Sequence, residues 1–163
     1  MKPNVYLAGK IGKNDFRHYL IPRLGNHTWA DGQIETKWFC YVGPFFVSCD
    51  HACNHGPNTH GAIAQNTICE AEFTRQQVIS NNMAALESAD LVIVYITSLD
   101  CYGTVFEIGW AKAKEKRVVI CFAPGIDHSD LWVSTGQVDA IYEDINLCCL
   151  KRIVDEEARH VCR

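Results

Sequence analysis

The sequence predicts an α/β domain of the doubly wound type, in which helices cover both faces of a parallel sheet. Segments with strand composition alternate with segments of helical periodicity along the chain. The run Leu91–Ile96 is apolar at every position and rich in β-branched residues, which is typical of a strand buried on both faces. Polar loops follow the first and the central predicted strands, and ligands bind at such places in open parallel sheets.

Length and composition fit one soluble domain over residues 1–163, with 48% hydrophobic and 21% charged residues. The net charge is −4 and no dense Lys/Arg run occurs, which argues against binding of a nucleic-acid polymer. Because there is neither a long apolar run nor a signal peptide, we expect a cytoplasmic protein that does not contact membranes. The nine cysteines are then expected to be reduced thiols.

The first predicted strand is Asn4–Ala8, and a turn containing Gly9, Lys10 and Ile11 follows it. Glycine lets such a turn approach a phosphate or a sugar closely, although a plain turn explains the pattern equally well. A helix is predicted over 15–24, with Asn14 as its cap.

The next part of the chain predicts strands at 36–42 and 45–49, and an insertion at about 43–61. Four Cys and His residues alternate within 49–55, so in an extended strand they span about 20 Å and cannot all bind one zinc ion. A metal site, a surface loop without a role, and a polar wall of the substrate crevice remain as alternatives. We favour the wall, with Asp50 and His51 contacting the substrate.

The second half of the chain continues the alternation of helices and strands. The predicted elements are a helix at 64–88, the strand Leu91–Ile96, a helix at 105–114, a strand at 118–122, a short helix ending at 133, a strand at 139–142 and a helix at 145–160. The prediction is therefore five parallel strands in the order 2-1-3-4-5. In that order the turn after the first strand lies beside the loop that follows Leu91–Ile96.

Glu107 has two interpretations. Thr104-x-x-Glu107 fits a capping box, in which the carboxylate satisfies a backbone amide at a helix start. Alternatively, Glu107 is a catalytic carboxylate that the positive helix end keeps ionised. Nearby, Tyr102 and Phe106 belong either to the core or to a stacking surface for a base, and Cys101 is a candidate reactive thiol.

Two stretches resemble the nucleoside 2-deoxyribosyltransferase superfamily, which includes the 2′-deoxynucleoside 5′-phosphate N-hydrolases. They are Tyr-x-x-Gly at 6–9 and Gly-Thr-x-x-Glu-x-Gly at 103–109. The resemblance implies a flavodoxin-like fold, Glu107 as nucleophile and Tyr6 as the residue that positions it. It also implies a glycine turn at 9–13 that holds a nucleotide, and a homo-oligomer. We expect no cofactor and no metal.

The implied reaction is cleavage or transfer at the N-glycosidic bond of a nucleoside or nucleoside 5′-monophosphate, through a covalent glycosyl-glutamate intermediate. Asp100 is the candidate that positions the sugar hydroxyls or protonates the leaving base. Substrate contacts are expected from Gly9, Lys10, Ile11, Asn82, Ser98, Gly103, Thr104, Asp50 and His51.

The sequence departs from the family at two positions. Asn82 stands where the family usually has an aspartate, and Cys101 stands where the transferases often have one. A non-catalytic nucleotide-binding or signalling module on the same scaffold is therefore the alternative function.

Overall fold

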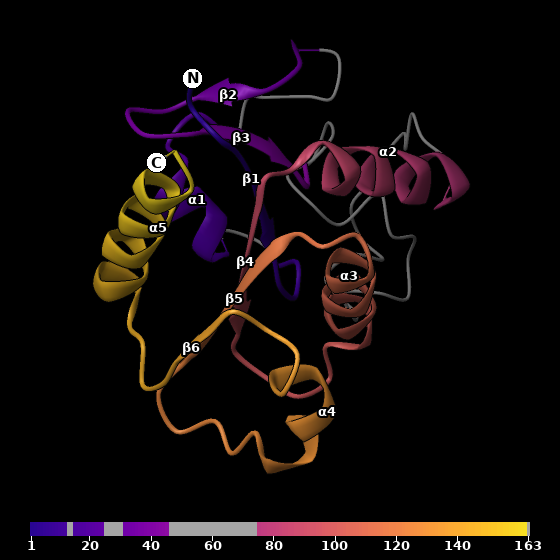
Figure 1. The fold of residues 1–163 in the computed structure, drawn as a ribbon, viewed down its shortest axis with the longest axis vertical. Coiled ribbons are helices and arrows are strands. Elements are labelled where there is room, and N and C mark those ends of the chain that lie inside the picture. Colours follow the sequence, from indigo (N-terminus) through magenta and orange to yellow (C-terminus); the bar gives the residue numbers. More distant parts are fainter. Residues whose placement is uncertain (13–14, 25–30, 46–74, 163) are drawn as a thin grey trace, which may run out of the picture.

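The computed structural model describes residues 1–12, 15–24, 31–45 and 75–162. They form one sheet of six strands in the order β2-β3-β1-β4-β5-β6 (Figure 1). The strands are β1 Asn4–Ala8, β2 Ile34–Glu35, β3 Cys40–Gly43, β4 Leu91–Ile96, β5 Arg117–Phe122 and β6 Ala140–Tyr142. All neighbours pair in parallel except β2, which pairs antiparallel with β3.

The predicted order of five parallel strands is confirmed, but the predicted number of strands is wrong. The additional strand, β2, has only two residues at the edge of the sheet. The strand expected at 36–42 begins only at Cys40, because Thr36 closes a turn with Phe39. The Thr36 amide and hydroxyl both donate to the Phe39 carbonyl oxygen, at 2.9 and 2.7 Å.

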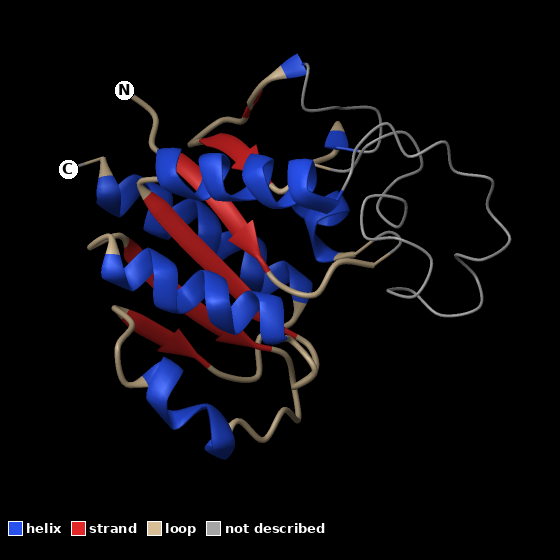
Figure 2. Ribbon diagram, turned by 90° about the vertical axis from the view of Figure 1, so that its right-hand side faces the viewer, coloured by secondary structure: helices blue, strands red, loops and turns tan. Residues whose placement is uncertain are grey.

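Helices cover both faces of the sheet, as Figures 1 and 2 show. The helices are α1 Phe16–Leu20, α2 Arg75–Ser88, α3 Tyr102–Ala113, the 3-10 turn η5 Ser129–Leu131, α4 Trp132–Thr135 and α5 Leu147–Val161. One core joins the sheet to α1 and α5, and the other joins it to α2 and α3. Residues of β1 alternate between them: Val5 and Leu7 face the first core, whereas Tyr6 and Ala8 face the second.

Several predicted segments lie wholly or partly outside the described residues. They are the strand at 45–49 beyond Phe45, the insertion at 43–61 beyond the same residue, and the first part of the helix at 64–88. Within the described ranges, α1 ends at Leu20, before Pro22, and α3 begins at Tyr102 rather than at 105. No helix in these ranges is both long and apolar enough to cross a membrane.

Candidate active site

The structure brings Tyr6 of β1 and Glu107 of α3 into direct contact. The Tyr6 side chain is fully buried on the α2–α3 face of the sheet, and its hydroxyl donates to Glu107 Oε1 at 2.6 Å. Glu107 itself is half-buried. Among the described residues, no donor reaches its second oxygen, Oε2. The contact therefore fixes the carboxylate through one oxygen and leaves the other available.

Burial and hydrogen bonding act on Glu107 in opposite directions. Burial raises the pKa of Glu107, while the Tyr6 hydrogen bond and the positive charge of Arg17 lower it, and the net shift is upward. The pKa of Tyr6 is raised well above its usual value by burial and by the neighbouring carboxylate. Tyr6 therefore remains a protonated donor at neutral pH, and Glu107 is the acceptor.

The capping-box interpretation of Glu107 is wrong. Helix α3 begins at Tyr102, and its N-cap, Cys101, makes no side-chain capping bond. Glu107 consequently lies in the second turn and is bonded to Tyr6 instead of to a free amide. The influence of a helix dipole fades beyond the first turn, so Tyr6 and Arg17 replace the helix end as the groups that favour the ionised form.

A second polar group connects the two loops at the carboxyl ends of β1 and β4. Lys10 Nζ donates to Asp100 Oδ2, and Ser98 Oγ donates to Asp100 Oδ1. Both Lys10 and Asp100 are exposed. The hydrogen bond from Lys10, followed by that from Ser98, lowers the pKa of Asp100, which is therefore ionised at neutral pH.

The turn after β1 requires glycine at position 9. Gly9 has φ +151°, a conformation that side chains rarely adopt. A Cβ atom there would lie 2.7 Å from the Tyr95 carbonyl oxygen and 2.9 Å from Phe16 Cε1. Two residues later, half-buried Ile11 packs against the α1–α5 core.

Sequence reasoning missed Arg17, which is fully buried behind this turn. Its guanidinium donates to the carbonyl oxygens of Leu7 and Gly9, and to Asp15. The sequence predicted a helix over 15–24 but gave no role to Arg17. The available signal was Asp15-x-Arg17 directly after a glycine turn, because an aspartate two residues away can neutralise a buried arginine.

The other predicted residues that the structure describes lie on α2 and on the first turns of α3. Asn82 is half-buried on α2, and its Oδ1 atom is buried without a partner in the described ranges. Tyr102 and Phe106 are 83% and 61% exposed, so the interpretation as core residues is wrong.

At the start of α3, Gly103 is exposed and Thr104 is buried. Cys101 is buried as well, which raises its pKa and disfavours a reactive thiolate. Asp50, His51 and the rest of the Cys/His-rich loop lie outside the described residues.

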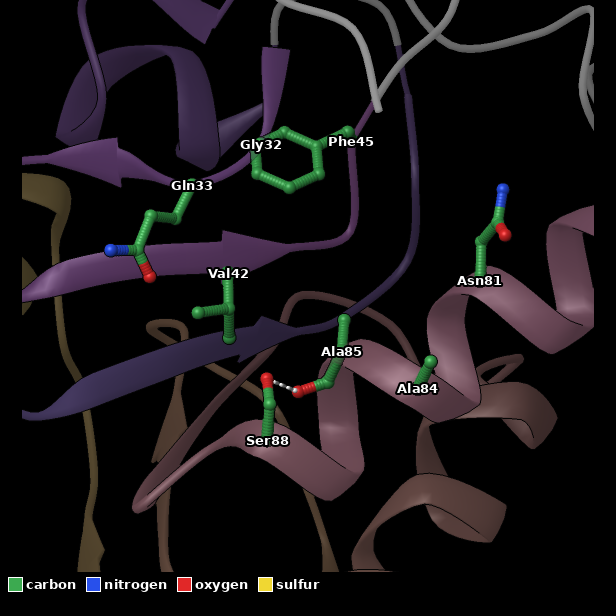
Figure 3. Close-up of a pocket in the computed structure, with 8 residues that line it drawn as sticks. All are labelled: Gly32, Gln33, Val42, Phe45, Asn81, Ala84, Ala85 and Ser88. Carbon is green, nitrogen blue, oxygen red and sulfur yellow. Dashed lines mark hydrogen bonds between the residues drawn. The ribbon is translucent and has the colours of Figure 1, made fainter. Parts of the chain in front are cut away.

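A groove of about 420 Å³ lies between α2 and the β2–β3 edge (Figure 3). It is lined by Gly32, Gln33, Val42, Phe45, Asn81, Ala84, Ala85 and Ser88. None of the predicted site residues that the structure describes belongs to this lining. The groove is thus separate from the Tyr6–Glu107 contact, although both lie on the α2–α3 face of the sheet.

Two comparisons with known proteins bear on this arrangement. The chain matches a protein-family model described as nucleoside 2-deoxyribosyltransferase like over residues 2–125. The matched range includes Tyr6, Lys10, Asp100 and Glu107 and ends shortly after β5. A search of curated proteins gives no match.

Proposed function

Because the chain belongs to the nucleoside 2-deoxyribosyltransferase-like family, we propose that it cleaves the N-glycosidic bond of a nucleoside or nucleoside 5′-monophosphate. The observation that carries this proposal is the hydrogen bond from Tyr6 to Glu107. It holds a half-buried carboxylate in one orientation while its second oxygen lacks a donor among the described residues. A nucleophile needs this combination of fixed geometry and an available lone pair.

In the proposed reaction Glu107 attacks C1′ of the sugar through an oxocarbenium-like transition state. The C1′–N bond breaks, and its electron pair leaves with the base, which takes up a proton. In the second step a water molecule, or the nitrogen of another base, attacks C1′, loses a proton to solvent and releases the Glu107 carboxylate. Two displacements at C1′ retain its configuration.

Lys10 and Asp100 are proposed to bind the substrate at the mouth of the crevice. The exposed Lys10 ammonium suits a 5′-phosphate or a sugar hydroxyl, and the ionised Asp100 suits a hydroxyl donor. The lowered pKa of Asp100 makes it a weak general acid, so we favour sugar binding over protonation of the base. The buried, unpaired Oδ1 of Asn82 is proposed to accept a hydrogen bond from the substrate.

The test measures release of free base. Purified protein is incubated with ribo- and 2′-deoxyribonucleosides, each with and without a 5′-phosphate, in the presence and absence of a second base, and the products are separated by chromatography. We expect at least one substrate to be cleaved, Glu107→Gln to abolish cleavage, and Glu156→Gln, an exposed residue on α5, to leave it unchanged. Cleavage by Glu107→Gln at the wild-type rate would overturn the assignment of Glu107 as the nucleophile.

The alternative is a module that binds nucleotides without reacting. Two departures favour it: the amide at position 82, where the family usually has an aspartate, and the buried thiol at position 101, where the transferases often have one. Calorimetry with the same compounds distinguishes the two functions: tight binding to a protein that releases no base supports the module, and turnover excludes it.

A further inference from the structure

Arg17 ties together the backbone at the end of β1. Its Nε donates to the Leu7 carbonyl oxygen at 2.8 Å, and its Nη2 donates to the Gly9 carbonyl oxygen at 2.6 Å. These two carbonyl groups belong to the residues on either side of Ala8, and Leu7 directly follows Tyr6. A guanidinium holds its donors in one rigid plane, so both bonds together restrict the backbone more than a single flexible ammonium does.

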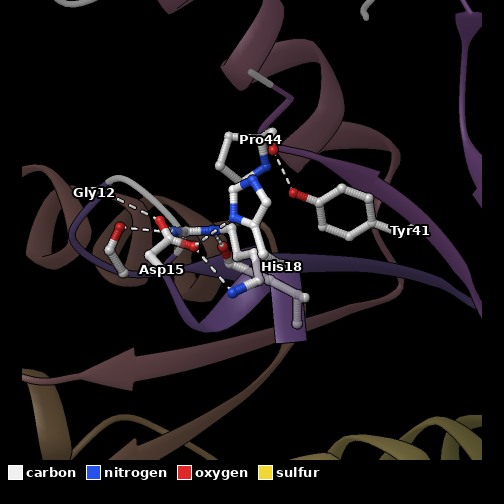
Figure 4. A network of polar contacts seen from close by, with 8 residues as sticks. Gly12, Asp15, His18, Tyr41 and Pro44 are labelled. Atoms are coloured by element: carbon white, nitrogen blue, oxygen red, sulfur yellow. Dashed lines mark hydrogen bonds and ion pairs between the residues drawn. The ribbon is translucent and has the colours of Figure 1, made fainter. Parts of the chain in front are cut away.

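Asp15 neutralises this buried arginine. Figure 4 shows Asp15 with two further residues that contact its carboxylate, Gly12 and His18. The Asp15 carboxylate accepts Arg17 Nη1 at 2.6 Å, and it also accepts the backbone amides of Gly12 and Arg17 at 3.1 and 3.0 Å. His18 Nδ1 lies 3.8 Å from the same carboxylate. The charge of Arg17 is therefore held in place by the turn that follows β1.

Arg17 and Glu107 approach the end of β1 from opposite faces of the sheet. Helix α1 packs on the face that carries α5, whereas α3 packs on the other face. Tyr6 connects them, because its hydroxyl bonds Glu107 and the next carbonyl group along the strand bonds Arg17.

We propose that Arg17 is a positioning residue for Glu107, acting across the sheet through β1: it fixes the backbone beside Tyr6 and supplies a buried positive charge behind the tyrosine–glutamate pair. The inference extends the proposed function, since it assigns Arg17 a role in preparing the nucleophile. Arg17 does not itself touch the substrate in this proposal.

The electrostatics of the cluster agree with this role. The charge of Arg17 lowers the pKa values of Glu107, Tyr6 and Tyr41. Among the described residues, the titratable groups that shift the pKa of Glu107 are Tyr6 from β1 and Arg17 from α1. Glu107 in turn raises the pKa of Tyr41 on β3. Arg17 is the cation among them, so it favours the ionised glutamate that a nucleophile requires.

The experiment follows the ionisation of Glu107 directly and needs no turnover. The protein is labelled with ¹³C at the glutamate side-chain carboxyl carbons, and the Glu107 resonance is assigned by its loss in Glu107→Gln. Titrations then compare wild type with Arg17→Met, Arg17→Lys and Asp15→Asn. We expect the Glu107 midpoint to rise in Arg17→Met, to fall in Asp15→Asn, and to stay near wild type in Arg17→Lys, which keeps the charge.

Kinetics give a second readout on any substrate that the protein cleaves. In Arg17→Met, kcat/KM is expected to fall about tenfold to a hundredfold, and the acidic limb of its pH profile should move to higher pH. In Arg17→Lys, the acidic limb should return to its wild-type pH, because the positive charge is kept. Only part of kcat/KM should return, because lysine lacks the planar guanidinium that bonds two carbonyl groups at once.

Opposite shifts in Arg17→Met and Asp15→Asn cannot arise from loosened structure alone. An unchanged or lowered midpoint in folded Arg17→Met would overturn the proposal. If Arg17→Met does not fold, the titration of Asp15→Asn provides the test. An unchanged or raised Glu107 midpoint in Asp15→Asn would then overturn the proposal. Failure of the proposed function would look different: no substrate would be cleaved, while the Glu107 titration would still respond to Arg17.

Discussion

At the scale of single residues, Glu107 is a carboxyl group whose surroundings disfavour its charged form. Burial opposes its charge, and one phenol and one guanidinium offset that cost only in part, because the net pKa shift is upward. A surface glutamate would be ionised at a smaller cost. The half-buried position of Glu107 instead keeps its carboxylate poorly solvated, which supports the nucleophilic role proposed for it.

Glu107→Gln is expected to stabilise the protein in a pH-dependent way. The pKa of Glu107 is higher in the folded state than its ordinary value of 4.5, so the unfolded chain loses this proton first as the pH rises. The wild-type free energy of unfolding therefore falls as the pH rises from the ordinary pKa of Glu107 to its raised pKa in the folded state. Melting temperatures of the two proteins should be similar near about pH 4, and Glu107→Gln should melt higher near about pH 8. A constant difference between them at all pH values would contradict the prediction.

Tyr6→Phe tests the hydroxyl that holds Glu107. Loss of the hydrogen bond should raise the pKa of Glu107 further and lower kcat about tenfold to a hundredfold, because the carboxylate loses its fixed orientation. Tyr41→Phe is the matched control: Tyr41 is another fully buried tyrosine, on the adjacent strand, but its hydroxyl bonds the Pro44 carbonyl oxygen. Equal losses of kcat in both variants would show that the effect comes from packing.

At the scale of elements, burial decided how well the sequence predicted the structure. Strand β4 has the predicted bounds Leu91–Ile96, because all six of its residues are buried and its composition is unambiguous. Strand β2 has two residues and no pattern that a sequence could reveal. The start of α3 was predicted three residues late, because Tyr102 and Gly103 look like loop residues although they form its first turn.

Glu157 of α5 joins that helix to two strands, and its loss should be costly. Its carboxylate accepts Arg117 Nη2 at 2.7 Å and the Tyr142 hydroxyl at 3.0 Å, while only 9% of the side chain is exposed. Glu157→Ala leaves both donors without this partner, so the free energy of unfolding should fall by about 2–3 kcal/mol. Denaturant unfolding measures this change.

The exposed Lys151–Asp155 pair on the same helix provides the control for Glu157. Asp155→Ala should cost at most about 0.5 kcal/mol, as is usual for a solvated pair one turn apart. Because Glu157 lies on the face covered by α5, Glu157→Ala should retain full activity per folded molecule. Equal destabilisation in the two variants would show that Glu157 contributes no more than a surface pair.

At the scale of the whole molecule, the candidate site follows from the strand order. Strands β1 and β4 are adjacent and parallel, so the loops after them meet, although Lys10 and Asp100 are 90 residues apart. Sequence reasoning predicted this meeting because topology alone requires it. It did not predict the burial of Arg17, because an isolated arginine in a short helix looks like a solvated residue until Asp15 and two carbonyl groups are seen around it.

Ligand binding should protect two segments that are far apart in sequence. Glu107→Gln protein with saturating 2′-deoxynucleoside 5′-monophosphates forms a complex in which substrate is not consumed. Hydrogen exchange measured by mass spectrometry should slow at Gly9–Gly12 and at Ser98–Thr104 together, since the Lys10–Asp100 bond joins the two loops beside the proposed site. Peptides from α5, which packs on the opposite face, serve as the internal reference and should exchange unchanged. Protection confined to α2 and β3 would place the ligand in the separate groove lined by Val42 and Ala85, and would contradict a site built around Glu107.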